Sequence, residues 1–125
     1  MDASVLRQWL WCISLLGMVI IAGCASTPTS QKSCPVTKKE VAYVQRQAEA
    51  GDADARFQLA DWYHRGRCFP TDHLKEAKWI QRAAEQGHRE AQFRLGQMLF
   101  FGTGVEKNES AAATWFRKAA QSKSF

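Results

Sequence analysis

From Lys38 onward, apolar and small side chains recur at the three-then-four spacing of an amphipathic helix. The first such stretch places Val41, Val44 and Ala48 on one face, a pattern that predicts a helix with one buried side. The same spacing returns four more times before the chain ends. The helices predicted in this way cover residues 38–50, 52–65, 73–86, 88–101 and 109–121.

An internal repeat underlies this pattern. Residues 48–83 align without a gap on residues 84–119, a shift of 36 positions that leaves ten identities. A fixed period of this length is the signature of a stacked repeat architecture. The sequence therefore predicts a half unit over 38–50 and two full units over 51–86 and 87–121. The identical pairs are Ala48/Ala84, Glu49/Glu85, Gly51/Gly87, Ala55/Ala91, Phe57/Phe93, Leu59/Leu95, Gly66/Gly102, Ala77/Ala113, Trp79/Trp115 and Ala83/Ala119.

Residues at the predicted helix ends support the same division. Asp72 and Asn108 occupy equivalent positions just before the second helix of each unit, where a side-chain oxygen can accept hydrogen bonds from the free amide groups of a helix start. Gly51 and Gly87 follow helices, where glycine accepts the left-handed backbone that ends a helix. The helices are therefore short and joined by tight connections.

The repeat resembles the Sel-one-like repeat, a family within the tetratricopeptide-like α-solenoids. The resemblance covers residues 48–120 and extends faintly back to Lys38. The first unit departs from the pattern, since Ala60 and Cys68 stand where the family has glycine. What the resemblance implies is an all-α fold, a short α-solenoid of antiparallel helix pairs with about two and a half repeats. The residues that carry it are Ala84, Gly87, Ala91, Leu95, Gly96, Gly102, Gly104, Val105, Ala113, Trp115, Ala119 and Ala120.

The front of the chain has a different character. Residues 9–22 form an unbroken run of apolar and small residues, too short to span a hydrocarbon core of about 30 Å but suited to the core of a signal peptide. The run leads into Ile21, Ala22, Gly23 and Cys24, which resembles the bacterial lipobox. The resemblance implies a signal peptide over 1–23 and a covalent lipid on Cys24. The competing interpretation is an uncleaved signal anchor.

The residues after Cys24 extend this interpretation. Ala25 and Ser26 resemble the sorting pattern of outer-membrane lipoproteins, because the aspartate of inner-membrane retention is absent. We therefore expect a lipid-anchored protein on the outer membrane of a Gram-negative bacterium, facing the periplasm. Residues 24–37 are rich in serine, threonine and proline, without periodic apolar positions, and read as a flexible tether.

Charge narrows the classes of partner. The formal net charge is +5 and the sequence pI is about 9.2. This balance either favours acidic partners or an anionic membrane surface, or reflects only a mildly basic solvated surface. No run of five or six basic residues occurs; Lys38 and Lys39 are only a pair. Nucleic-acid binding is therefore not expected.

Cys34 and Cys68 remain after the leader cysteine Cys12 and the lipidated Cys24 are set aside. An even number of cysteines in an oxidising compartment predicts pairing, and the two should lie at the same end of the first helices. We expect a Cys34–Cys68 disulfide. The competing interpretation is a metal site, because His64 and His73 flank Cys68. That spacing with one distant cysteine is not a recognised zinc pattern, so no metal site is expected.

The surface expected to bind a partner follows the first helix of each unit. On a helical wheel, Asp54, Gln58, Asp61 and Arg65 form one stripe, and Glu90, Arg94, Gln97 and Phe101 are their equivalents. In tetratricopeptide-like solenoids the first helices line the concave face, and this stripe differs between units while the packing positions repeat. The alternative left open is that Trp62 and Phe101 are buried. The expected partner-binding residues are Gln58, Asp61, Trp62, Arg65, Arg94, Gln97, Met98 and Phe101.

Enzyme signatures are missing from the sequence. It contains neither Ser-x-x-Lys nor Gly-x-Ser-x-Gly, and Gly102-Thr103-Gly104 is the turn of the repeat and not a phosphate loop. We expect no enzyme activity, no small-molecule substrate and no cofactor beyond the lipid on Cys24. The expected function is to bind another protein, with toxin neutralisation by an immunity protein as one subtype.

Two alternatives stay open. Cysteine-rich members of the family have been described as β-lactamase-like hydrolases, although in that group cysteines recur within each unit and here the second unit has none. The other alternative is a purely structural envelope spacer.

Overall fold

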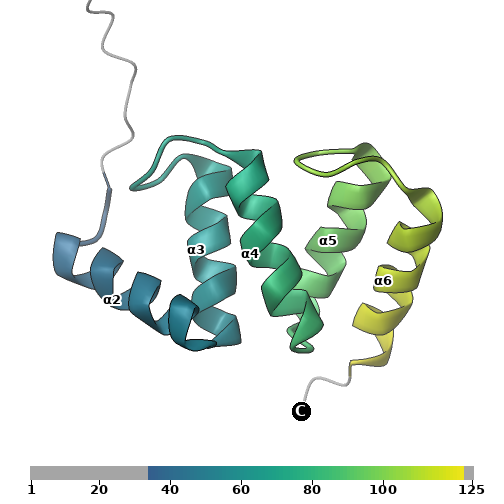
Figure 1. Cartoon of the computed structure of the whole chain (residues 1–125), viewed down its shortest axis with the longest axis horizontal. Helices are drawn as coiled ribbons and strands as arrows, with labels where there is room; N and C mark the ends of the chain where they lie inside the picture. Colours follow the sequence, from purple (N-terminus) through teal and green to yellow (C-terminus); the bar gives the residue numbers. More distant parts are fainter. Residues whose placement is uncertain (1–33, 123–125) are drawn as a thin grey trace, which may run out of the picture. The chain divides into compact units, whose positions relative to one another are not determined.

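Five helices run back and forth in a single row over residues 34–122, the part of the chain that the computed structural model describes. Each helix packs against the next one along the chain, and Figure 1 shows the alternating directions from α3 to α6. The all-α fold of antiparallel helix pairs is therefore confirmed. The helices are α2 (Lys38–Ala50), α3 (Ala53–Arg65), α4 (His73–Glu85), α5 (Arg89–Phe101) and α6 (Glu109–Gln121).

Several predictions concern residues outside the described part of the chain. The signal peptide over 1–23, the lipidated Cys24 and most of the tether over 24–37 lie there. Within residues 34–122, every helix is too short and too polar to cross a membrane. The anchor therefore stays a prediction from the sequence.

Side chains just before each helix explain why the helices begin where they do. Asp72 accepts hydrogen bonds from the amides of Leu74 and Lys75, and Asn108 accepts one from Ala111. The bond from the Lys75 amide is the largest cause that lowers the pKa of Asp72 below its usual value. The predicted helices were one residue too long at Asp52 and His88, because these residues cap α3 and α5 from the preceding position.

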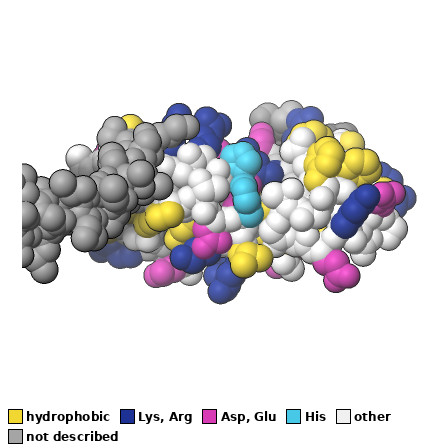
Figure 2. Space-filling view, turned by 90° about the horizontal axis from the view of Figure 1, so that it is seen from above, with side chains coloured by type: hydrophobic (Ala, Val, Ile, Leu, Met, Phe, Trp, Pro, Cys, Tyr) yellow, Lys and Arg dark blue, Asp and Glu magenta, His cyan; other side chains and the backbone are white. Residues whose placement is uncertain are grey.

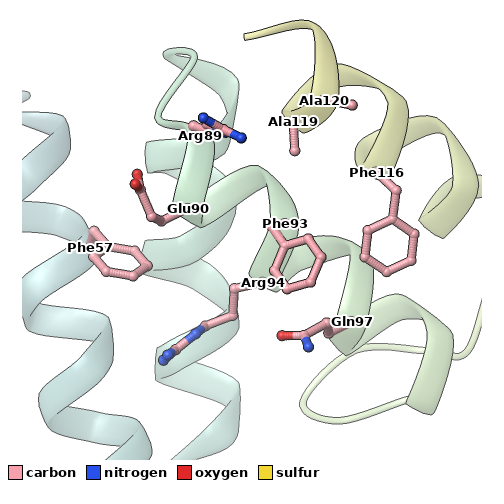
Figure 3. A pocket seen from close by; sticks show the side chains of 9 residues that line it. All are labelled: Phe57, Arg89, Glu90, Phe93, Arg94, Gln97, Phe116, Ala119 and Ala120. Carbon is pink, nitrogen blue, oxygen red and sulfur yellow. The ribbon is translucent and has the colours of Figure 1, made fainter. Parts of the chain in front are cut away.

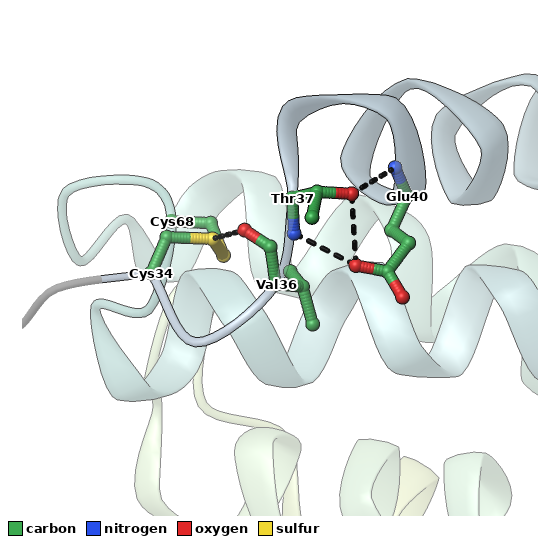
Figure 4. Close-up of a disulfide and its surroundings, with 5 residues drawn as sticks. All are labelled: Cys34, Val36, Thr37, Glu40 and Cys68. Atoms are coloured by element: carbon green, nitrogen blue, oxygen red, sulfur yellow. Dashed lines mark hydrogen bonds between the residues drawn. A yellow bond between two sulfur atoms is a disulfide. The ribbon is translucent and has the colours of Figure 1, made fainter.

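The start of α2 is fixed in a similar way. Thr37 and Glu40 form a reciprocal capping box: the amide of Thr37 donates to the Glu40 carboxylate at 2.7 Å, and the amide of Glu40 donates to the Thr37 hydroxyl at 3.3 Å. The Thr37 amide lowers the pKa of Glu40. Figure 4 shows this box close to the Cys34–Cys68 pair.

Alanine supplies most of the closest helix contacts. Ala48, Ala60, Ala83, Ala91 and Ala112 have no exposed surface, so neighbouring helices meet there with only a methyl group between them. Two clusters of buried residues result, one around Leu59 on α2 and α3 and one around Ile80 and Leu95 on α3 to α5.

The loop after the first helix of each unit contains a left-handed residue. Gly104 has φ +69, and a β-carbon there would collide with the backbone carbonyl of His73. Cys68 occupies the equivalent position in the first unit and has φ 61, a positive value rare for a residue with a side chain. The first unit therefore has Cys68 where the second unit has Gly104, and this cysteine adopts the positive φ that glycine adopts more easily.

The disulfide accounts for this exception. Cys68 is bonded to Cys34, 34 positions earlier in the sequence, which confirms the predicted pair. The bond ties the segment before α2 to the loop between α3 and α4. It thereby restrains the side of the first unit that faces the start of the chain, where no full unit precedes it within the described residues.

Removing the disulfide tests its contribution to stability. With Cys34 and Cys68 both replaced by serine, the free energy of unfolding should fall by about 4 kcal/mol, the loop-closure value for this separation. The pair Cys34→Ser, Cys68→Gly should retain about 1 kcal/mol more, because glycine accepts the positive φ without strain. Urea unfolding followed by circular dichroism measures both. Equal stabilities would show that the backbone at position 68 is unstrained.

A second pair of variants tests the close approach at Gly104. Gly104→Ala should lower the free energy of unfolding by about 2–4 kcal/mol, because a left-handed alanine is combined with a collision against His73. Gly87 also has a positive φ, +94, but nothing lies within 4 Å of an added β-carbon, so Gly87→Ala should cost about 1 kcal/mol. The same urea experiment compares them, and equal losses would contradict the close contact.

Candidate functional site

The first helices of the two units, α3 and α5, meet through the stripe residues Asp54 and Arg94 and through Phe57 and His88, which lie close to them. The ring of His88 stacks on Phe57 with centroids 4.7 Å apart, and its Nε2 lies 3.1 Å from an oxygen of Asp54. The guanidinium of Arg94 lies 5.4 Å from the centre of the Phe57 ring. The two stripes therefore form one continuous surface across the unit boundary.

A chain of ion pairs crosses this surface. Asp61 binds Arg65 at 2.9 Å on its own helix and Arg94 at 3.5 Å on α5. Arg94 also lies 3.7 Å from the buried carboxylate of Glu76 on α4. Three of the eight expected partner-binding residues, Asp61, Arg65 and Arg94, are thus brought together, and their charges partly neutralise one another.

A groove of about 830 Å³ lies beside this network. Figure 3 shows it between α3, α5 and the second half of α6, with the rings of Phe93 and Phe116 side by side. Those two rings lie 5.4 Å apart, and 51% of Phe93 is exposed. The lining residues are Phe57, Arg89, Glu90, Phe93, Arg94, Gln97, Phe116, Ala119 and Ala120.

A smaller cavity of about 240 Å³ lies nearer the loop end of α5. Gln97 and Arg94 line both hollows, so the cavity and the groove are adjacent. Phe101 is 71% exposed beside the small cavity, and its ring makes an edge contact with Phe100 at 5.1 Å. The residues around the small cavity are His64, Glu76, Arg94, Gln97, Met98, Phe101 and Thr103.

Two of the expected partner-binding residues are in the wrong place for that role. Trp62 and Met98 are buried, with 6% and 4% of their surface exposed, and they belong to the two core clusters. They border the stripe on the side that faces neighbouring helices, so α2 and α4 cover them. Phe101 is exposed as expected, and Gln58 is exposed but lines neither hollow.

The aromatic residues of the groove are not among the binding residues expected from the sequence. Phe57 and Phe93 are an identical pair of the repeat, and neither was placed on the binding stripe. In the first unit, His88 and Arg94 of the next unit cover Phe57. In the second unit no further unit follows within the described residues, so the same position leaves Phe93 half exposed.

A second cluster lies at the loop end of α3 and α4. His64 and His73 both direct Nδ1 at the carboxylate of Glu76, at 3.0 Å and 2.8 Å. Glu76 is buried while both histidines are exposed, and Figure 2 shows histidine side chains together on the face of the molecule that carries the loops. Glu76 was not singled out by sequence, because a glutamate in an amphipathic helix is usually on its solvated side.

Comparison with known proteins identifies the repeat. The Sel1 repeat matches this chain twice, over residues 53–88 and 89–124, which is the predicted period with each unit beginning two residues later. A search of curated proteins gave no significant match. Sel1 repeat proteins usually mediate protein–protein interaction, on a scaffold that is typically non-catalytic.

Solved structures show the same arrangement of helices. A Sel1 repeat protein from Oxalobacter formigenes has 33% identity and a TM-score of 0.64 over 65% of this chain and 33% of its own. Helicobacter pylori cysteine rich protein B has 27% identity and a TM-score of 0.67 over 71% of this chain and 68% of its own.

A protective antigen of uropathogenic Escherichia coli strains that displays an SLR fold is also similar, with 35% identity and a TM-score of 0.59. This alignment covers 62% of our chain but only 17% of the antigen. The present chain thus spans a third or less of two of these three proteins. Since two matched repeats make up more than half of its residues, the chain belongs to the Sel1 repeat family.

Proposed function

We propose that this protein binds a segment of another protein in the groove between α3, α5 and α6. The observation that carries the proposal is the aromatic lining of the groove, to which α3, α5 and α6 contribute Phe57, Phe93 and Phe116. Exposed aromatic side chains in a concave surface are the usual anchors of protein interfaces. The groove therefore suits a partner that inserts an aromatic or aliphatic side chain.

The charge at the rim indicates what should flank that side chain. Arg94 is already paired with Asp61 and Glu76, whereas Arg89 is exposed and forms no ion pair with the described residues. Glu90 stands next to it, so the rim is only locally positive. An acidic residue of the partner placed near Arg89 would gain a favourable contact and steer association.

The proposed setting is the outer membrane. Its support is the sequence alone: the apolar run over 9–22, the lipobox-like residues that end in Cys24, and the polar stretch up to residue 37. A lipid on Cys24 would hold the helical array near the periplasmic surface of that membrane. Neutralisation of a toxic effector would be one role for a binding protein placed there.

Truncation of the groove aromatic tests the binding surface. Phe93→Ala should weaken the complex with the physiological partner at least tenfold, because it removes a half-exposed ring from the centre of the groove. Affinity capture from envelope extracts with the intact lipid-anchored chain, followed by quantitative mass spectrometry, identifies the partner. Titration of that purified partner then measures the loss. A toxic effector among the captured proteins would make the chain an immunity protein.

Tyr43→Ala is the matched control, since Tyr43 is 59% exposed on α2 and lies outside the groove. It should leave the affinity unchanged. Arg89→Glu should weaken the binding of an acidic partner while having little effect on the stability of the fold. If Phe93→Ala and Tyr43→Ala bind equally well, the groove is not the binding surface.

The anchor has a separate test. Cys24→Ala removes the acceptor of the lipid, and we expect the protein to leave the outer-membrane fraction of a fractionated cell. Metabolic labelling with a fatty acid should label the parent chain, which carries Cys24, and leave the Cys24→Ala variant unlabelled. Equal labelling of the two chains would exclude lipidation at Cys24.

A further inference from the structure

The cluster of His64, His73 and Glu76 has an unusual arrangement for a small helical repeat. The Glu76 side chain is 2% exposed, whereas those of His64 and His73 are 46% and 45% exposed. The three ligand-type atoms lie within 4.8 Å of one another. A buried carboxylate thus opens toward solvent between two imidazole rings.

The second unit shows that the fold does not need this cluster. The position equivalent to Glu76 is Ala112, which is completely buried, and the positions of the two histidines hold Phe100 and Glu109. An apolar residue therefore satisfies the packing there. Burying a carboxylate is unfavourable unless it is paired, so the first unit carries a costly group for which the second unit shows no structural need.

We propose that His64 Nδ1, His73 Nδ1 and the Glu76 carboxylate bind a divalent transition-metal cation, for which Zn²⁺ is the appropriate probe. Two imidazoles and one carboxylate form a recognised donor set for zinc. With bonds of about 2.0–2.1 Å, tetrahedral ligand atoms lie about 3.3 Å apart. The observed gaps from the two imidazoles to the carboxylate, 3.0 Å and 2.8 Å, need to open by a few tenths of an ångström. The ligand nitrogens of the two imidazoles, which lie within 4.8 Å of each other, need to approach the same spacing, a shift that two exposed side chains can make.

This donor set differs from the one considered in the sequence analysis. There the third ligand was Cys68, and the spacing argued against a metal. Cys68 is bonded to Cys34 and cannot act as a thiolate ligand. In the proposed site, Glu76, one helical turn after His73, is the third ligand. The expectation of no metal site concerned the set with Cys68 and not the set with Glu76.

The surrounding structure holds the ligands in position and leaves them accessible. His64 lies near the end of α3 and His73 begins α4, and the amide of Asp72 donates to the carbonyl of Tyr63 at 3.1 Å between them. The disulfide restrains the same loop from the other side. The small cavity reaches both His64 and Glu76, which provides an entry path and room for a water molecule or a partner's side chain as the fourth ligand.

Arg94 opposes a bound cation. Its guanidinium lies 3.7 Å from Glu76, but it also lies 3.5 Å from Asp61, which can retain the positive charge when Glu76 binds the metal. Removing that charge should favour the cation. The affinity for Zn²⁺ should therefore rise in Arg94→Gln, a change that a purely structural hydrogen-bond cluster would not produce.

The test is a calorimetric titration of the tag-free full chain in detergent, with free thiols alkylated so that they do not compete. We expect one Zn²⁺ per chain and no saturable binding of Mg²⁺, which prefers oxygen ligands. His64→Ala and His73→Ala should each weaken Zn²⁺ binding more than about tenfold. Both side chains are exposed, so circular dichroism should show these variants folded.

His88→Asn is the matched control. His88 is the third histidine of the chain and caps α5 through Nδ1, a role that asparagine also fills. Zn²⁺ should bind this variant as it binds the parent chain and should raise the melting temperature of both, but not of the His64→Ala, His73→Ala double variant. An absence of saturable Zn²⁺ binding to the parent chain, or equal binding to that double variant, would overturn the proposal.

Discussion

Close contact between helices at buried alanines is the constraint on which this structure depends. Where Ala48, Ala60, Ala83, Ala91 and Ala112 meet the neighbouring helix, no surface remains exposed. A larger side chain there would push two backbones apart, which typically costs about 1–3 kcal/mol. Because each helix packs mainly on its chain neighbours, these contacts set the spacing along the row.

The same constraint explains why the two units share a core but differ outside it. Packing positions can change only when the partner position changes with them. Gly96 leaves room for the ring of Phe116, which a β-carbon would approach to 2.7 Å, whereas Ala60 and Ile80 occupy the equivalent core positions of the first unit. The residues of the expected binding stripe do not pack in the core, so they can change without a matching change in a neighbouring helix.

The candidate sites lie at the boundary between the two units, where surface residues can differ from one unit to the other. Arg94 on α5 reaches Asp61 on α3 and Glu76 on α4, so one residue joins the groove to the histidine cluster. In the first unit, Phe57 is covered by the following unit, and in the second the equivalent Phe93 is half exposed. A single repeated position is therefore partly covered in one unit and exposed in the other.

The sequence by itself determined the helices, the period and the cysteine pair. Apolar spacing, capping residues such as Asp72 and Asn108, and an offset of 36 residues are local or periodic signals that need no knowledge of neighbours. Only the tertiary structure decided that Trp62 and Met98 are buried, that Phe93 is exposed, and that Glu76 lies between two histidines. Exposure depends on which helix of another unit covers a side chain, and a helical wheel contains only the helix to which the side chain belongs.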